Sequence, residues 1–215
     1  MKFYFSLFSV AFYLIKVIKK LKIELLDRGL FNLYAKHYCL RYKVKFDPLK
    51  VTFNGHAKLH FCPNSQVMIG DEFICNSGVD WSMDNTCCSK ISVWENATLQ
   101  FGFRSGISNT TIHCSQSIII GDFVNIGAGC LIFDTNYHSS NWRDREDRIK
   151  DIENGKRAPI KIGNHVFVGA HSVITKGVTI GDKSMIAAGS VVMSDIPSGE
   201  IWGGNPARFI AKIKE

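Results

Sequence analysis

Aliphatic residues recur at every sixth position through the C-terminal part of the chain. Six consecutive groups of six residues each begin with Ile or Val, at Ile162, Val168, Ile174, Ile180, Ile186 and Val192. The fifth position of each group is small or β-branched, and the same phase returns upstream at Ile120, Ile126 and Ile132. A period of six is not helical. It predicts a parallel β-helix in which three groups close one triangular coil.

The pattern divides the chain into three parts. We expect a basic helical segment over residues 1–50, a β-helix over 51–200 and a tail or helix over 201–215. The repeat stops at 138–158, where the chain is charged and irregular, and we expect a loop that projects from the coil. Glycine and Asx residues at the second and third positions are expected to relieve the turns. The predicted fold class is all-β, a parallel β-helix with a helical N-terminal segment.

The charge of the chain is concentrated before the repeat. Residues 1–50 contain eleven Lys/Arg and three Asp/Glu, a balance of +8, whereas residues 51–215 contain fifteen against sixteen, a balance of −1. A nearly neutral coil argues against a nucleic-acid-binding face. The seven cysteines stand at scattered spacings without a CxxC pair, which indicates reduced thiols rather than a disulfide framework or a zinc site.

The N-terminal segment begins with an uncharged run, FYFSLFSVAFYLI, at residues 3–15, and a cluster of lysines follows it. Such a run forms about 20 Å of helix, which is too short to cross a hydrocarbon core of about 30 Å. The lysines stand where a secretory signal would need a small-residue cleavage site. Two interpretations of residues 1–28 remain open. One is a peripheral helix on an anionic membrane surface, and the other is a helix packed on the main domain or on a partner.

Three stretches of the chain resemble the hexapeptide-repeat O-acetyltransferases, which include galactoside, maltose and capsular polysaccharide acetyltransferases. They read IIIGDFVNIGAGCLIFDTNYH, APIKIGNHVFVGAHSVITKGVTIGDKSMIAAGSVV and IWGGNPARFIAKI, and they fall within about residues 100–212. The resemblance implies a left-handed coil and a homotrimer with active sites between subunits. It also implies transfer of an acetyl group from acetyl-CoA to a carbohydrate hydroxyl, without a metal. We expect a cytoplasmic enzyme of capsule or lipopolysaccharide assembly.

His138 stands where the repeat breaks, and it matches the catalytic base of that family. A neutral imidazole, with an ordinary pKa of about 6.5, can remove a hydroxyl proton at physiological pH. Asp134 and Asn136 stand just before it, and His113 lies one coil earlier. We expect these three side chains to hold the acceptor sugar or to orient the base.

The resemblance assigns acetyl-CoA binding to positions in the last coils. These positions are Gly169, Ala170, Ala187, Ala188, Ser194 and Arg208. Small side chains let the pantetheine arm approach the backbone closely, and a guanidinium suits the phosphates of the nucleotide.

Two other functions fit a β-helix. The γ-class carbonic anhydrases share this coil, but they need three histidines that converge on zinc. His165 and His171 are six residues apart, which places them on adjacent faces of the triangle, so no metal site is expected. A non-catalytic scaffold is the second alternative, and it leaves the loop after His138 unexplained.

Overall fold

The computed structural model describes residue 14 and residues 17–18, 29–78 and 88–214. Most of residues 1–28, for which two interpretations are open, therefore lies outside the described residues. Among the helices that are described, none is long and apolar enough to cross a membrane.

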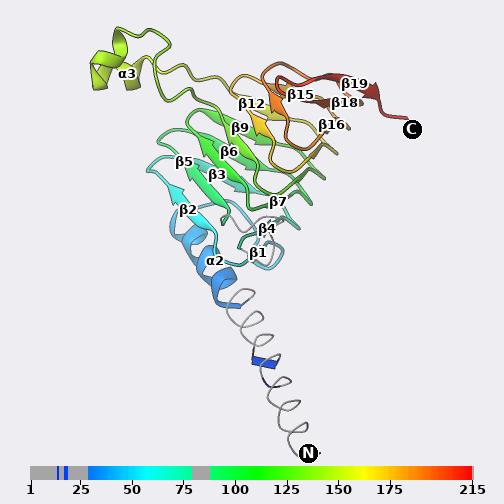
Figure 1. Ribbon diagram of the computed structural model, residues 1–215. Coiled ribbons are helices and arrows are strands. Elements are labelled where there is room, and N and C mark those ends of the chain that lie inside the picture. Colours follow the sequence, from blue (N-terminus) through cyan, green and yellow to red (C-terminus); the bar gives the residue numbers. More distant parts are fainter. Residues whose placement is uncertain (1–13, 15–16, 19–28, 79–87, 215) are drawn as a thin grey trace, which may run out of the picture.

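From Thr52 onward the chain winds as a parallel β-helix with three faces, and Figure 1 shows the coils stacked along one axis. One face is an eight-stranded sheet that contains, in order, β1 (Thr52–Asn54), β4 (Ile74–Asn76), β7 (Gly106–Ser108), β10 (Asn125–Ile126), β13 (Phe167–Val168), β16 (Met185–Ile186), β18 (Glu200–Gly203) and β19 (Arg208–Lys212). The second face is a six-stranded sheet of β2 (Lys58–Phe61), β5 (Lys90–Val93), β8 (Thr111–Cys114), β11 (Leu131–Phe133), β14 (Val173–Ile174) and β17 (Val191–Val192). The third is a five-stranded sheet of β3 (Gln66–Ile69), β6 (Thr98–Phe101), β9 (Ser117–Ile120), β12 (Ile160–Ile162) and β15 (Thr179–Ile180).

The six-residue period sets the core as predicted. All six first positions, from Ile162 to Val192, are fully buried, and the fifth positions, from Val166 to Ile196, are buried beside them. Each first position stacks on the equivalent residue one coil away, as Val168 does on Ile186. The result is a tube filled by Ile and Val, in which β-branched side chains suit the stacked strands.

The turns follow a different rule from the one expected. A left-handed backbone falls at the fourth position of the groups, with φ of 57° at His165 and 60° at Lys183, and not at the second or third. The glycine at the second position is instead required because neighbouring coils stack too closely there for a side chain. A Cβ on Gly121, for example, would lie 2.9 Å from the carbonyl group of Gly163. The Asx residue at the third position links coils, because the Asn164 side chain accepts a hydrogen bond from the backbone N–H of Asp122.

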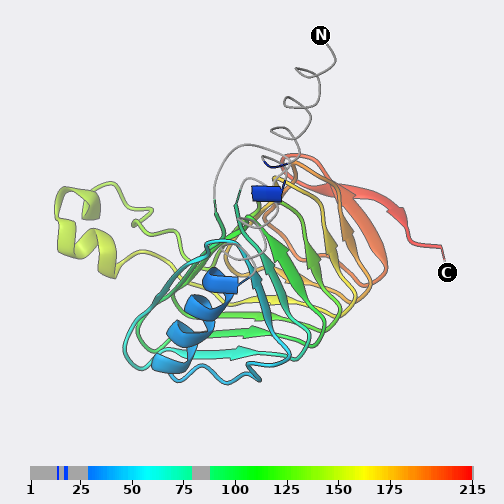
Figure 2. The ribbon, with the colours of Figure 1, turned by 90° about the horizontal axis from the view of Figure 1, so that it is seen from below.

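Two elements leave the coil or lie against its first turns. Helix α2 (Phe31–Arg41) packs against the first coils, with Ala35 and Cys39 buried and with Asn32 Oδ1 accepting the backbone N–H of Phe53. Figure 2 shows this end of the molecule. The predicted loop leaves the six-stranded sheet after β11 and returns to the five-stranded sheet at β12. It contains a 3-10 turn, η3 (Asp144–Glu146), and helix α3 (Arg148–Glu153), which projects from the coil in both views.

The prediction for residues 201–215 is wrong. Instead of a tail or a helix, β18 and β19 form an antiparallel pair that adds two strands to the eight-stranded sheet. Gly203 and Arg208 lie opposite each other near the turn of this pair. The hexapeptide phase ends at Val192, so the period gave no signal for these strands.

Candidate active site

His138 lies at the start of the projecting loop and is held by a carboxylate from α3. Its Nδ1 atom is 2.6 Å from Oδ2 of Asp151. The other carboxylate oxygen, Oδ1, accepts the backbone N–H of Ser139 at 2.8 Å. The imidazole is 68% exposed, whereas the Asp151 side chain is 12% exposed. The His138 ring is therefore accessible to solvent, whereas the carboxylate that holds it is almost buried.

The charge state of Asp151 fixes the form of the imidazole. The hydrogen bond from His138 lowers the pKa of the Asp151 carboxyl, and the backbone N–H of Ser139 and the charge of Arg145 act in the same direction. An ionised carboxylate can only accept hydrogen bonds, so Nδ1 must carry the proton. In the neutral ring the lone pair then lies on Nε2, the nitrogen that points away from Asp151. This is the tautomer that a general base requires.

A network of side chains within the loop holds α3 in place. Asp147 caps α3 by accepting the backbone N–H groups of Ile149 and Lys150. Asp144 accepts hydrogen bonds from Ser139 Oγ at 2.7 Å and from Asn154 Nδ2 at 3.0 Å. These contacts join the first residues of the loop to its helix. The position of Asp151 beside His138 is therefore set by the loop itself.

An aromatic cluster lies next to His138 on the outer surface of the six-stranded sheet. The rings of Tyr137 and His113 have centroids 4.6 Å apart, and Trp94 lies 5.5 Å from His113 on the other side. Phe133 completes the cluster, 6.4 Å from Tyr137. Burial lowers the pKa of His113 and raises that of Tyr137 to about 12. Both side chains are therefore neutral at physiological pH, and the cluster is an uncharged surface on which a sugar ring can stack.

Two predicted acceptor residues have different environments. Asp134 is fully buried, with Oδ1 2.7 Å from the backbone nitrogen of Ser115 and with Oδ2 accepting the N–H groups of Gln116 and Ser117. Its expected contact with an acceptor does not fit this burial, because the carboxylate holds a turn of the preceding coil. Asn136 is exposed two residues before His138, so its side chain is accessible there.

The structure brings together most of the residues expected to bind acetyl-CoA. Gly169, Ala170, Ala187 and Ala188 lie in two stacked turns that lead from the eight-stranded to the six-stranded sheet. A Cβ on Gly169 would lie 2.5 Å from the backbone nitrogen of Ala188, so the two turns are in close contact. This edge of the coil presents backbone and small side chains to solvent.

The two remaining residues of that group differ in position. Arg208 reaches the same edge, because it is paired with Gly203, whose Cβ would lie 2.8 Å from the side chain of Ala187. Its side chain is exposed. Ser194 follows β17 and lies at a different corner, where the chain leaves the six-stranded sheet. The structure therefore separates Ser194 from the other five positions.

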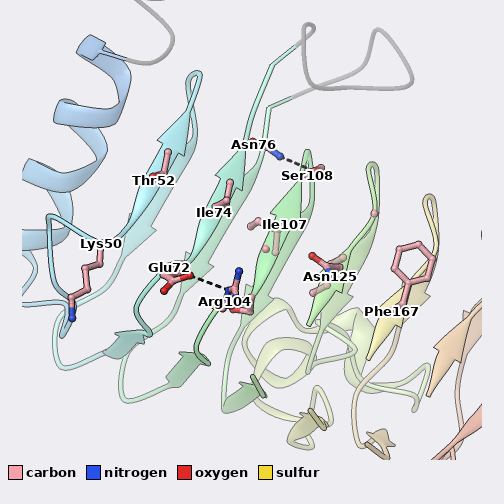
Figure 3. A pocket seen from close by; sticks show the side chains of 14 residues that line it. Lys50, Thr52, Glu72, Ile74, Asn76, Arg104, Ile107, Ser108, Asn125 and Phe167 are labelled. Carbon is pink, nitrogen blue, oxygen red and sulfur yellow. Dashed lines mark hydrogen bonds and ion pairs between the residues drawn. The ribbon is translucent and has the colours of Figure 1, made fainter. Parts of the chain in front are cut away.

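A groove of about 740 Å³ lies on the outer surface of the eight-stranded sheet. Figure 3 shows its floor, where Asn76, Ser108, Asn125 and Phe167 come from successive strands. The Asn76 amide donates to Ser108 Oγ at 3.3 Å. An ion pair between Arg104 and Glu72, 3.0 Å apart, lines one side. Sequence reasoning missed these residues because they occupy ordinary outward positions of the repeat, which the period alone does not distinguish.

The histidines at the turns do not form a metal site. His165 lies where the chain passes from the five-stranded to the eight-stranded sheet, and its ring stacks on Phe123 at 4.7 Å. His171 lies at the next corner, before β14. Across the described part of the chain, no three His, Cys, Asp or Glu side chains are grouped so that they could hold a metal ion.

Comparisons with known proteins agree with the coil. Residues 159–194 match the family described as the hexapeptide repeat of succinyl-transferase. Galactoside O-acetyltransferase of Escherichia coli (strain K12) is 32% identical over 133 residues, which are 58% of this chain and 63% of that protein. The 2,3,4,5-tetrahydropyridine-2,6-dicarboxylate N-acetyltransferase of Clostridium perfringens (strain SM101 / Type A) is 42% identical over 64 residues, which are 30% of this chain and 27% of that protein. The chain thus spans less than two thirds of either relative.

Among solved structures, a hexapeptide-repeat acetyltransferase of Vibrio cholerae O1 biovar eltor, in complex with acetyl coenzyme A, is similar along most of the chain. It is 26% identical with a TM-score of 0.54, and the match covers 87% of this chain and 85% of that one. Residues 159–194 thus carry hexapeptide repeats, and the coil is a left-handed β-helix like that of the hexapeptide-repeat acetyltransferases. Within that class its similarities lie with the acetyltransferases.

Proposed function

We propose that this protein is an acetyl-CoA-dependent acetyltransferase that acetylates a hydroxyl group of a sugar. The observation that carries the proposal is the exposed imidazole of His138, held by Asp151 with its Nε2 free to accept a proton. The coil that supports it is similar to that of a Vibrio cholerae acetyltransferase solved with acetyl coenzyme A. The similarity to an O-acetyltransferase of galactosides supports a carbohydrate acceptor.

In the proposed reaction His138 acts as a general base. Nε2 removes the proton of the acceptor hydroxyl while the oxygen attacks the thioester carbonyl, and the C–S bond then breaks to release the coenzyme A thiolate. The thiolate takes up the proton from the imidazolium, so the enzyme returns to its starting state. The Asp151 carboxylate stabilises the positive charge that the ring carries during the reaction. No acyl-enzyme is needed because the thioester is already activated.

The proposed donor site is the edge formed by the stacked turns at Gly169 and Ala187. The small residues of these closely stacked turns would let a pantetheine arm lie against the backbone. Arg208 extends from the same edge and would pair with phosphate groups of the nucleotide. Ser194 is removed from this site in our proposal because it lies at another corner.

We further propose that the active enzyme is a homotrimer in which the groove of one copy faces His138 of another. His138 emerges at the corner between the six-stranded and five-stranded sheets, and in a triangular coil the eight-stranded sheet lies opposite that corner. The groove and the base of a single chain therefore lie on opposite sides of the coil. Exposed apolar side chains, among them Phe167 on the eight-stranded face and Trp94 and Leu131 on the six-stranded face, support packing between these two surfaces.

The acceptor in this proposal is a sugar unit of a surface polysaccharide, modified in the cytoplasm during capsule or lipopolysaccharide assembly. The aromatic cluster would stack on a sugar ring, and the amides and hydroxyls of Asn76, Ser108 and Asn125 would bind its hydroxyl groups. Asn136, exposed beside His138, would bind the same acceptor.

The first experiment is a titration of acetyl-CoA and desulfo-CoA into the purified protein, followed by measurement of thiol release with a panel of sugars. Micromolar binding at about one site per chain and sugar-dependent release support the proposal. His138→Ala should bind acetyl-CoA normally and lower turnover by about 10²–10⁴-fold. Full activity in this variant would exclude the mechanism. Binding without turnover on any acceptor would favour a scaffold, and one zinc per chain would favour a carbonic-anhydrase-like enzyme.

A mixing experiment tests the assembly. We would combine His138→Ala, which keeps the groove, with Ser108→Trp, which fills the groove and keeps the base. If the site is shared between copies, one site of the three in each mixed trimer regains activity, which is about a quarter of all sites after random assembly of equal amounts. If the mixture remains as inactive as each variant alone, base and groove belong to one chain. Light scattering on the same samples gives the number of copies.

A further inference from the structure

The end of the coil next to α2 carries an exposed apolar stripe. Leu33 and Leu40 on α2, and Leu30 directly before it, are 67%, 55% and 58% exposed. Leu33 follows Leu30 by three residues and Leu40 follows Leu33 by seven, which places the three side chains on one side of a helix. Ala35 and Cys39 on the other side are buried against the coil. Within the described residues, α2 is thus covered on one apolar side and open on the other.

A run of basic residues lies at the same end, just before Asp47, which pairs with Lys50. Residues 29–46 contain four Lys/Arg and no Asp/Glu. Arg41, Lys43 and Lys45 form no ion pair with any described residue. These three cations line a cavity of about 490 Å³ between the end of α2 and β3, and no acidic side chain is among its lining residues. The cations therefore present unneutralised charge beside the leucine stripe.

We propose that this end of the molecule, the surface formed by Leu30, Leu33, Leu40, Arg41, Lys43 and Lys45, docks on an anionic lipid bilayer. The leucines would enter the boundary between headgroups and acyl chains, while the cations would meet the lipid phosphates at the level of the cavity. An apolar stripe flanked by cations complements such a bilayer, whose surface is negatively charged and whose interior is apolar.

The geometry of the coil suits this orientation. Helix α2 lies at the first coils, whereas α3 lies well away from it in Figure 1. Docking through α2 would therefore leave the His138 loop directed away from the lipid. Leu14 and Ile18, described residues that precede α2 in the chain, are also more than half exposed. The inference goes beyond the proposed acetyltransferase activity and does not depend on it.

The test is co-sedimentation of the full chain with vesicles of phosphatidylcholine, with and without phosphatidylglycerol. We expect binding to the anionic vesicles, weak binding to the neutral ones, and release as salt is raised to about 0.5 M, where screening is strong. Each cation at a bilayer surface contributes about fivefold to binding. The triple variant Arg41→Gln, Lys43→Gln, Lys45→Gln should therefore bind on the order of a hundredfold more weakly.

A second variant and a matched control separate this surface from net charge and from residues 1–28. Leu33→Ser with Leu40→Ser changes only exposed side chains and should weaken binding about tenfold. The control Lys161→Gln, Lys176→Gln, Lys214→Gln removes the same charge elsewhere and should bind as the wild type does.

Three results would overturn the proposal. The first is wild-type binding by both the charge variant and the leucine variant, which would assign any lipid contact to other residues. The second is an equal loss in the control, which would show a response to net charge alone. The third is a change of oligomeric state in the leucine variant without loss of vesicle binding, which would make the stripe a contact between copies. Coenzyme A binding by each variant, measured separately, reports on the enzymatic proposal.

Discussion

Asp151→Asn tests the arrangement at His138 most directly. The substitution keeps the size of the side chain and an oxygen that can accept the N–H of Ser139, but it removes the negative charge beside Nδ1. The amide can also turn its NH₂ group toward Nδ1, which would move the ring proton to Nε2 and remove the lone pair from the reacting side. We therefore expect a loss of turnover without a loss of acetyl-CoA binding.

The size of the effect follows from the exposure of the pair. General base catalysis as a whole contributes about 10²–10⁴-fold, and removing the orienting carboxylate removes only part of it. The imidazole is 68% exposed, so water screens the charge of Asp151 and can partly replace it. We expect kcat to fall by about 10- to 100-fold, with less than about a threefold change in KM for acetyl-CoA.

The assay is steady-state release of the coenzyme A thiol at saturating acetyl-CoA, at neutral pH. Asp147→Asn is the matched control, because it changes an aspartate of the same loop and preserves an acceptor at the start of α3. It should retain most of the activity. The assigned tautomer is contradicted if Asp151→Asn keeps more than about half of the wild-type kcat, or if both substitutions reduce kcat equally.

Three further predictions concern the coil and the aromatic cluster. Gly169→Ala should lower the free energy of unfolding in urea by about 3 kcal/mol, because its Cβ would collide with Ala188. At Gly189 an added Cβ would meet no atom within 4 Å, but the backbone φ is 71°, so Gly189→Ala should lower the free energy of unfolding by about 1 kcal/mol. Equal losses in the two variants would contradict the role of close stacking at Gly169. Because burial lowers the pKa of His113, the fold is stabilised above the ordinary histidine pKa of about 6.5 and loses this as pH falls through the depressed value. The melting temperature of the wild type should therefore fall more between pH 7 and pH 5 than that of His113→Phe, and parallel curves would contradict this. Trp94→Ala should raise KM for the sugar by about tenfold and leave KM for acetyl-CoA unchanged, whereas an unchanged sugar KM would exclude stacking.

The sequence predicted the coil well because its rule is local and repeated. Each group of six places one residue inward, so Ile162 and Val168 could be assigned to the core without knowledge of anything distant. The position of the loop followed from the break in that rule after Ile132. Where the rule stopped, at β18 and β19, the prediction failed, because an antiparallel pair depends on a partner and not on a period.

The site was predicted only in part for the same reason. His138 stood out because it breaks the pattern, but Asp151, thirteen residues later in an irregular segment, carried no signal that could pair it with His138. Asp134 is the opposite case, because the sequence predicted a contact with the acceptor that its burial does not fit. A carboxylate four residues from a candidate base is a reasonable ligand for a sugar, yet it is buried and accepts three backbone N–H groups. Only the neighbouring coil, distant in the sequence, reveals that role.

A parallel coil can aggregate through its ends, which a closed barrel does not have. Each end exposes rows of unpaired N–H and C=O groups that can pair with the coil of another copy. Here the first end lies under α2, where Asn32 takes up the backbone N–H of Phe53. At the other end β19 reverses direction, so the last strand of the eight-stranded sheet cannot continue the parallel winding, and Arg208 and Lys212 flank its apolar Phe209 and Ile210. The rod therefore has a defined length, and assembly is directed to its sides. A chain that lost either end would be expected to grow into filaments by end-to-end addition of copies.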